Sequence, residues 1–259
     1  MIYSYIKILK INIKMKNLIF LLLFLLVKSF KLNQPRLLQK KEKSIEERYS
    51  KLSAVSIKSY LKNKNVYVVD TRNNTISNIG YLPNSLILPL TMQYQKWFPN
   101  IIKNGSNVVL ICDETNYKAS LNQTEAFRIY NIFGYAIFDE VVKDNNFELK
   151  VAEYNNNTRK DVQKLVDKEK YLLDIREFEE YIETGVVQEA HLLPLSTFKD
   201  TYSKIPDNVD VYIFCKSGGR ALLAMTFLQR AGYGYKIIVM KGGMTKTIKE
   251  EYPVVPFEE

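Results

Sequence analysis

The feature that most restricts how this chain folds is an internal duplication that keeps its register. Three segments in the first part of the chain resemble three in the last part, in the same order. They are VYVVDTR (66–72) and YLLDIRE (171–177), SLILPL (85–90) and HLLPL (191–195), and NVVLIC (107–112) and DVYIFC (210–215). The offset stays between 103 and 105 residues, with Asp70 matching Asp174 and Cys112 matching Cys215. We therefore predict two copies of one domain, each about 100 residues long.

Within each copy, β-favouring runs alternate with helical runs. In the second copy, residues 209–214 predict a buried strand. The helices are expected at 176–183, 196–202 and 221–231. This alternation predicts an α/β fold in which each domain is a central, mainly parallel sheet with helices on both faces. The polar run at 154–158 predicts the joint, so that the domains span 45–150 and 158–259.

A glycine-tyrosine pair in each copy is expected to end the helix that follows the cysteine. The pairs are Gly134-Tyr135 and Gly232-Tyr233, and the strands expected after them are AIFDEVV (136–142) and KIIVM (236–240). On this alignment the segment from Cys112 to its glycine is five residues longer than the segment from Cys215 to Gly232.

Residues 1–30 differ from the rest of the chain in charge and hydropathy. They contain five lysines and no acidic residue, and 18–27 is an unbroken run of ten apolar residues. A run of this length is typical of a signal-peptide core and is short for a membrane-spanning helix. We interpret the segment as a targeting region. It is a cleaved secretory signal or an anchor that holds residues 17–30 at a membrane, with a mitochondrial presequence as the alternative.

The formal net charge of +9 raises the question of a nucleic-acid partner. Five of these charges lie in the first 30 residues, and the remaining +4 is spread over a surface of mixed sign, which argues against such a partner. Two cysteines exclude a disulfide scaffold and a cysteine-rich zinc site. The single histidine, His191, excludes a multi-histidine metal centre. No metal and no cofactor is expected.

Cys215 stands where the strand 209–214 stops and the apolar helix 221–231 begins. The residues after it are Lys216, Ser217, Gly218, Gly219 and Arg220. Two glycines permit the backbone angles that turn successive N–H groups inward, and such a nest attracts an anion. The helix N-terminus and the two cations favour the thiolate of Cys215 over the thiol, whose free pKa is about 8.5. The sequence therefore predicts a nucleophilic cysteine that needs no histidine base.

Over the whole second copy the chain resembles the rhodanese (sulfurtransferase) family. The resemblance is carried by YLLDIREFEEYIETG, AHLLPL, IFCKSGGRALLAMTFLQRAGY and IIVMKGGM. It implies tandem rhodanese-like three-layer domains. In that family the cysteine takes a sulfane sulfur from a small donor such as thiosulfate, and passes it from a persulfide to a thiol or another acceptor. Cys215 is then the nucleophile, the residues 216–220 are the substrate cradle, and Arg220 also anchors the anionic donor. Asp174 and Arg176 match a supporting pair, which we interpret as a buried ionic framework.

Two positions depart from the family pattern and put the donor in doubt more than the fold. Gly185-Val186-Val187 stands where Gly-His-Ile is common, and Met244-Thr245-Lys246 follows the final glycine pair where a tryptophan is usual. Related phosphatases have one more residue between cysteine and arginine. Phosphatase or arsenate-reductase chemistry is therefore a minor alternative.

The first copy keeps the scaffold and lacks this loop. Asp113 and Glu114 follow Cys112, and there is no glycine or arginine before Arg128. Carboxylates beside a thiol disfavour its thiolate, so Cys112 is interpreted as a buried structural cysteine in an inactive copy. The competing hypothesis for the whole chain is a non-catalytic rhodanese-like subunit of a membrane-associated assembly.

Overall fold

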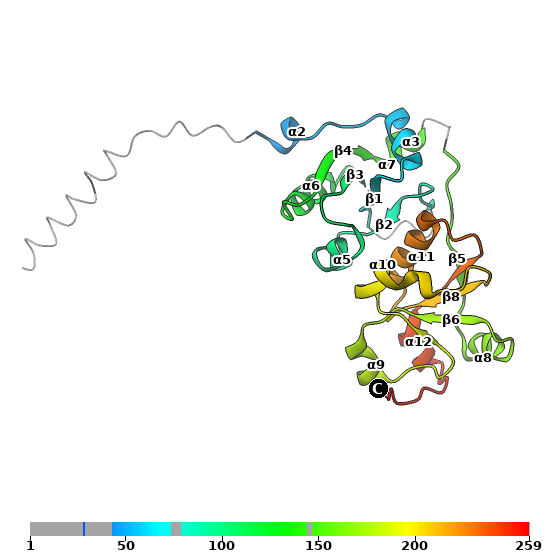
Figure 1. Cartoon of the computed structure of the whole chain (residues 1–259). Coiled ribbons are helices and arrows are strands. Elements are labelled where there is room, and N and C mark those ends of the chain that lie inside the picture. Colours follow the sequence, from blue (N-terminus) through cyan, green and yellow to red (C-terminus); the bar gives the residue numbers. More distant parts are fainter. Residues whose placement is uncertain (1–27, 29–42, 74–78, 144–146, 259) are drawn as a thin grey trace, which may run out of the picture. The chain divides into compact units, whose positions relative to one another are not determined.

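The computed structural model describes residues 28, 43–73, 79–143 and 147–258 (Figure 1). Apart from Lys28, the targeting region predicted at 1–30 lies outside the described residues. Among the helices that are described, none has both the length and the apolar character needed to span a membrane. Residues 45–259 cluster as one compact unit, and the two sheets described next both belong to it.

The first sheet has four strands in the order β2-β1-β3-β4, and all its neighbours are parallel. The strands are β1 (Val66–Asp70), β2 (Leu86–Ile87), β3 (Asn107–Cys112) and β4 (Asn131–Ile137). The helices of this half are α2 (Ile45–Arg48), α3 (Ala54–Lys62), α5 (Tyr94–Ile101), α6 (Tyr117–Glu125) and α7 (Phe138–Lys143).

The second sheet has five strands in the order β5-β9-β8-β6-β7, again all parallel. The strands are β5 (Glu153–Asn155), β6 (Tyr171–Asp174), β7 (His191–Leu192), β8 (Val211–Phe214) and β9 (Ile237–Met240). The helices are α8 (Arg159–Asp167), α9 (Phe178–Thr184), α10 (Phe198–Thr201), α11 (Gly219–Ala231) and α12 (Gly243–Lys249), with short 3₁₀ turns at Leu195–Thr197 and Tyr202–Lys204.

The two sheets repeat one topology, as the sequence register predicts. Read from β4, the order β4-β3-β1-β2 corresponds to β9-β8-β6-β7. Asp70 pairs with Ile87 and Ile111 on its two neighbouring strands. Asp174 pairs with Leu192 and Phe214 in the equivalent places. The predicted α/β fold with parallel sheets is therefore present in both halves.

The glycine-tyrosine alignment is wrong for the first half. Gly232 ends α11 in the left-handed conformation (φ 98°), as expected, but Gly134 lies inside β4 opposite Val109. A Cβ on Gly134 would lie 2.4 Å from the carbonyl oxygen of Ser50, so the glycine allows that chain to approach. The strand expected at 136–142 ends at Ile137, because the next residues start α7 with two acids in its first turn, where the helix dipole favours them.

The polar run expected to be a loose joint is part of the second half. Its first residues form β5, which pairs with β9. Asn157 is fully buried, donates to the carbonyl oxygen of Gly243 (2.8 Å) and accepts from the hydroxyl of Thr247 (3.1 Å). Thr158 then caps α8 through a reciprocal capping box with Asp161. Polar residues here satisfy buried backbone groups. Composition alone does not distinguish this role from exposure to solvent.

Alternate residues of the central strands pack on opposite sides of each sheet. In β3, Val109 and Ile111 pack in a cluster with α3 and α7, whereas Val108, Leu110 and Cys112 belong to a larger cluster. That larger cluster also contains residues from β8, β9 and α11. One apolar core is therefore shared by the two halves, and a smaller core lies on the other side of each sheet.

Helix α11 packs on its own sheet and also makes polar contacts with the first half. The hydroxyl of Thr226 accepts the N–H of Ile87 on β2 at 3.1 Å, and Gln229 accepts the hydroxyl of Tyr81 at 2.9 Å. Near the end of the helix, the guanidinium of Arg230 donates to the carbonyl oxygens of Lys64 (2.7 Å) and Val66 (2.9 Å). Arg230 is only 6% exposed, and this burial lowers its pKa.

Replacing Arg230 with alanine should therefore destabilise the protein strongly. The buried carbonyl group of Val66 and the partly buried one of Lys64 lose a charged donor, which costs about 1–3 kcal/mol of unfolding free energy. Urea unfolding of the full chain measures the change. Arg159→Ala, at an exposed position on α8, is the matched control and should change stability by less than about 0.5 kcal/mol. Equal effects of the two substitutions would contradict the role given to Arg230.

Candidate active site

Cys215 lies at the carboxyl end of β8, one turn before α11 begins at Gly219. Its sulfur accepts the backbone N–H of Gly218 at 3.1 Å. Gly218 has a φ of 109°, which residues with a side chain rarely adopt, and this angle lets the loop fold back over the sulfur. Of the successive inward N–H groups predicted for this loop, that of Gly218 contacts the sulfur in the structure.

A second glycine pair, Gly242-Gly243, packs against the backbone of the cysteine loop. A Cβ on Gly243 would lie 2.0 Å from the carbonyl oxygen of Cys215, a distance that no side chain could occupy. This close approach brings the next two N–H groups of the chain within hydrogen-bond distance of the loop. Met244 donates to the carbonyl oxygen of Cys215 (2.8 Å), and Thr245 donates to that of Lys216 (3.0 Å). The start of α12 thus fixes the backbone of the loop.

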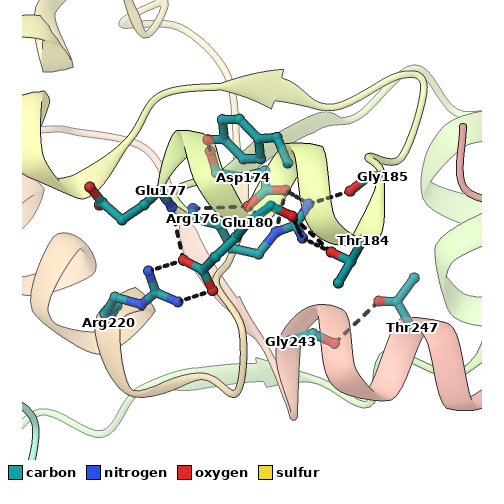
Figure 2. Close-up of polar contacts among 10 residues, drawn as sticks. Asp174, Arg176, Glu177, Glu180, Thr184, Gly185, Arg220, Gly243 and Thr247 are labelled. Carbon is teal, nitrogen blue, oxygen red and sulfur yellow. Dashed lines mark hydrogen bonds and ion pairs between the residues drawn. The ribbon is translucent and has the colours of Figure 1, made fainter. Parts of the chain in front are cut away.

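Arg220 forms a two-point ion pair with Glu180 of α9, as Figure 2 shows. Its two terminal nitrogens lie 2.5 and 2.7 Å from the carboxylate oxygens, and both side chains are largely buried. Burial alone would lower the pKa of Arg220, but the bond to Glu180 and the nearby Cys215 outweigh it and raise that pKa. Burial likewise opposes ionisation of Glu180, but the bond to Arg220, the N–H of Glu177 and the charges of Arg220 and Arg176 together outweigh it, so the pKa of Glu180 is lowered.

The sequence reasoning missed Glu180. Glu177 and Glu180 form a capping box at the start of α9, in which Glu180 accepts the N–H of Glu177 at 2.9 Å. A glutamate at the third helical position is the residue type that a capping box uses. It carries no signal that the same carboxylate also meets Arg220, 40 residues further along the chain.

Asp174 and Arg176 form a buried pair beside this site (Figure 2). The guanidinium of Arg176 bonds Asp174 through Nε and Nη2, and also donates to Thr184 Oγ1 (2.6 Å) and to the carbonyl oxygen of Gly185 (2.8 Å). In the first half Arg72 bonds Asp70 and the carbonyl oxygen of Gly80 in the same way. The pair therefore ties the strand end to the helix and loop after it.

A pocket of about 470 Å³ opens over the cysteine loop. The second half contributes Cys215, Lys216, Ser217, Gly219, Arg220 and three glutamates of the α9 region, Glu177, Glu179 and Glu180. The first half contributes Lys96 and Trp97 from α5, and Thr91, Met92 and Gln93 from the residues just before it. This second wall was not predicted, because nothing local in residues 91–97 marks them as neighbours of a loop so distant in sequence.

Residues 158–250 match the family described as "Rhodanese-like domain". A protein named "Sulfurtransferase" from Allochromatium vinosum is 36% identical over 94 residues, which are 36% of this chain and 86% of that protein. This chain belongs to the rhodanese family.

Among solved structures, a rhodanese-related protein from Thermoplasma volcanium is 26% identical, with a TM-score of 0.36, over 40% of this chain and 99% of that one. A thiosulfate sulfurtransferase from Pseudomonas aeruginosa is 13% identical, with a TM-score of 0.34, over 80% of this chain and 43% of that one. The family match includes every predicted site residue from Asp174 to Arg220 and excludes the pocket wall at 91–97.

In the equivalent loop of the first half, side chains bond the cysteine and the backbone around it. Cys112 is fully buried, and its sulfur accepts the hydroxyl of Thr71 at 3.5 Å. Asn116 accepts the N–H of Asp113 (2.9 Å) and donates to the carbonyl oxygen of Thr71 (3.0 Å). Burial raises the pKa of the Cys112 thiol to about 12. In the part of the chain that the structure describes, no group of three or more His, Cys, Asp or Glu residues is placed to hold a metal ion.

The two cysteines should differ in reactivity in the folded protein. Both cysteines are buried, with Cys215 only 1% exposed, but Cys215 lines a pocket and its sulfur already accepts an N–H, whereas burial raises the pKa of Cys112. At neutral pH, iodoacetamide should label Cys215 more than about tenfold faster than Cys112. Peptide mass spectrometry over time measures both rates, and full labelling in urea shows that both are detectable. Equal rates, or faster labelling of Cys112, would contradict the assignment.

Proposed function

We propose that this rhodanese-family chain is a sulfurtransferase whose reaction takes place at Cys215. The observation that carries the proposal is the sulfur of Cys215, held by the Gly218 N–H at 3.1 Å on the wall of a pocket that also presents Lys216 and Arg220. The relative from Allochromatium vinosum, named "Sulfurtransferase", supports it. The chemistry needs a nucleophilic sulfur and a cradle for negative charge, and both are supplied by backbone and cations.

In the proposed reaction, the thiolate of Cys215 attacks the outer sulfur of the donor. With thiosulfate as the donor, a sulfur–sulfur bond forms to Cys215, the sulfur–sulfur bond within thiosulfate breaks, and sulfite leaves with that electron pair. A thiolate acceptor then attacks the terminal sulfur of the Cys215 persulfide and regenerates the Cys215 thiolate. The N–H of Gly218 faces the Cys215 sulfur, which carries negative charge before the sulfur is loaded and again after it is passed on, so this N–H stabilises the thiolate that starts and ends the cycle.

Arg220 has a different place in this proposal from the one its sequence position suggests. Both of its terminal nitrogens are engaged by Glu180, so its first role is to neutralise that carboxylate beside the thiol. Without it, a largely buried negative charge would face an anionic donor and an anionic persulfide.

The first half, residues 45–150, is proposed to be an inactive copy that serves as a wall and support. It contributes the pocket residues at the start of α5 and the contacts to α11. Its own cysteine is sealed, which fits a supporting role.

Residues 1–30 are proposed to direct the protein to the secretory pathway or a membrane, or alternatively to the mitochondrion. Determining the mature N-terminus by intact mass spectrometry of the protein from its native source tests this assignment.

Cys215→Ser should abolish sulfur transfer, because a serine hydroxyl stays protonated in the same cradle and cannot hold a sulfane sulfur. Cys112→Ser should retain nearly full turnover if its fold is kept. Turnover with thiosulfate and a thiol or cyanide acceptor is measured, and a sulfur adduct on Cys215 is sought by intact mass. Absence of both turnover and adduct in the reduced wild type, with several donors, would reject the catalytic role and favour a non-catalytic rhodanese-like subunit.

The ion pair gives a second expected outcome. Arg220→Ala should slow sulfur loading of Cys215 about tenfold or more, because Glu180 is left unpaired next to the sulfur. The double variant Arg220→Ala/Glu180→Gln should recover most of the lost rate, because the unpaired charge is removed as well. Loading is followed by intact mass, and circular dichroism reports whether each variant is folded. If the double variant is as slow as Arg220→Ala, Arg220 acts by anchoring the donor directly.

A further inference from the structure

We propose that Trp97 of the first half is a positioning residue that holds the guanidinium of Arg220 against Glu180. Through that ion pair Trp97 acts on the reaction proposed at Cys215, so this inference rests on the proposed function and deepens it. The role falls to a residue outside the half that carries the reactive cysteine.

The apolar face of α5 places Trp97 on the pocket wall. The buried residues of this helix are Tyr94, Trp97, Phe98 and Ile101, which follow the i, i+3, i+4, i+7 spacing of one helix face. Trp97 is only 2% exposed, so packing holds its ring in one place. Phe98, on the same face, packs on Phe127, with 5.1 Å between the two ring centres.

The first half contacts two consecutive residues of the cysteine loop. The guanidinium carbon of Arg220 lies over the indole ring of Trp97, 5.7 Å from its centre. The sulfur of Met92 lies 2.9 Å from where a Cβ on Gly219 would be, so a side chain at that position would push Met92 away. Gly219 and Arg220 are the first two residues of α11. The wall therefore packs on the start of that helix.

The two contacts of Arg220 use different parts of its guanidinium. Glu180 bonds one edge through the two terminal nitrogens, at 2.5 and 2.7 Å (Figure 2). The edge contact leaves the flat faces of the group for an aromatic ring. Indole attracts a cation over its face more strongly than the other aromatic rings do, and the attraction increases where water is excluded. The side chain of Arg220 is only 12% exposed, so the contact with Trp97 is largely dry.

The pocket wall carries two further cations, Lys96 and Lys216. The ammonium of Lys96 also lies near the ring of Trp97, 4.5 Å from its centre. Both lysines are exposed, so water solvates their charges, whereas Arg220 is partly buried. Of these three cations, Arg220 is therefore the one whose position Trp97 can fix.

The position of Arg220 matters because its charge acts on two neighbours. The guanidinium interacts electrostatically with both Glu180 and Cys215. If it moved away from Glu180, the thiolate and an anionic donor would lie beside a carboxylate that is less well neutralised. Trp97 restricts this movement and so acts on the sulfur through Arg220.

The first test compares Trp97→Leu with Trp97→Phe in the full chain. Leucine and phenylalanine are similar in volume, but only phenylalanine keeps a ring face for the guanidinium. Trp97→Leu should slow both iodoacetamide labelling and thiosulfate loading of Cys215 about three- to tenfold, as expected for one lost cation–ring contact. Trp97→Phe should stay within about twofold of the wild type, because its ring keeps most of that contact. If the two variants are equally slow, the ring face has no part and the positioning role is wrong.

The second test asks whether Trp97 acts through Arg220. In an Arg220→Ala background, Trp97→Leu should change both rates by less than about twofold, because the charge that Trp97 positions is already gone. A wider pocket would affect both backgrounds alike, so a change in access to the sulfur cancels. If Trp97→Leu slows the Arg220→Ala variant as much as it slows the wild type, Trp97 acts by packing alone and the inference fails.

Phe98→Leu is the matched control, because it removes a buried ring from the same face of α5. It should leave both rates within about twofold of the wild type, since its ring contacts lie with Phe127 and Tyr130. Circular dichroism shows whether each variant is folded. If Trp97→Leu does not fold, Trp97→Met replaces it, because methionine adapts to irregular space and likewise has no ring. A slowing by Phe98→Leu equal to that of the Trp97 variant would contradict the specific role of Trp97.

Iodoacetamide labelling needs no sulfur transfer, so the two proposals fail separately. If labelling depends on Trp97 and Arg220 as expected but no donor loads Cys215, the proposed sulfurtransferase function fails and the effect on the thiol stands. If thiosulfate loads wild-type Cys215 and Trp97→Leu changes neither rate, sulfur transfer stands and the positioning role is wrong.

Discussion

Helix α11 is the element on which the rest of this structure depends. It follows directly from the cysteine loop, packs on β8 and β9 of its own sheet, and contacts β2 of the first half. Thr226 and Arg230 satisfy backbone groups of the first half from positions well inside the helix. A helix held along its length in this way cannot tilt freely, so the N-terminus that faces Cys215 has a fixed direction. The first half thereby helps to define the geometry of the loop that carries Cys215.

The two halves show which parts of their shared sheet topology can change independently. Both keep an Asp-x-Arg pair in which the guanidinium reaches a carbonyl oxygen of the following loop, Gly80 in one half and Gly185 in the other. The loop after the cysteine is different. In the second half the N–H of Gly218 approaches the sulfur, and in the first half the side chain of Asn116 bonds the neighbouring backbone groups. The ionic frame at the strand end thus occurs with two different loops after the cysteine of the next strand.

Local patterns in the sequence predicted the central strands, the parallel sheets, the cysteine loop and the end of α11 at Gly232. Each of these depends on residues close together in the chain, where periodicity and glycine placement act directly. Gly134 was misplaced because a two-residue similarity was preferred to the strand register. Glu180 and the wall at 91–97 were missed because their partners are distant in sequence. Asn157 was taken for linker because buried and solvated polar residues have the same composition.

The close approach of Gly243 to Cys215 also determines the directions in which the polar backbone groups of the cysteine loop point. The carbonyl oxygens of Cys215 and Lys216 are turned toward the first N–H groups of α12, while the N–H of Gly218 is turned toward the sulfur. The two hydrogen-bond acceptors therefore point away from the sulfur, and the donor points toward it. A sulfur that gains negative charge then meets a positive dipole and is kept away from two negative ones. The absence of a side chain at Gly243 therefore affects the electrostatic environment of the thiol, although Gly243 itself does not touch the sulfur.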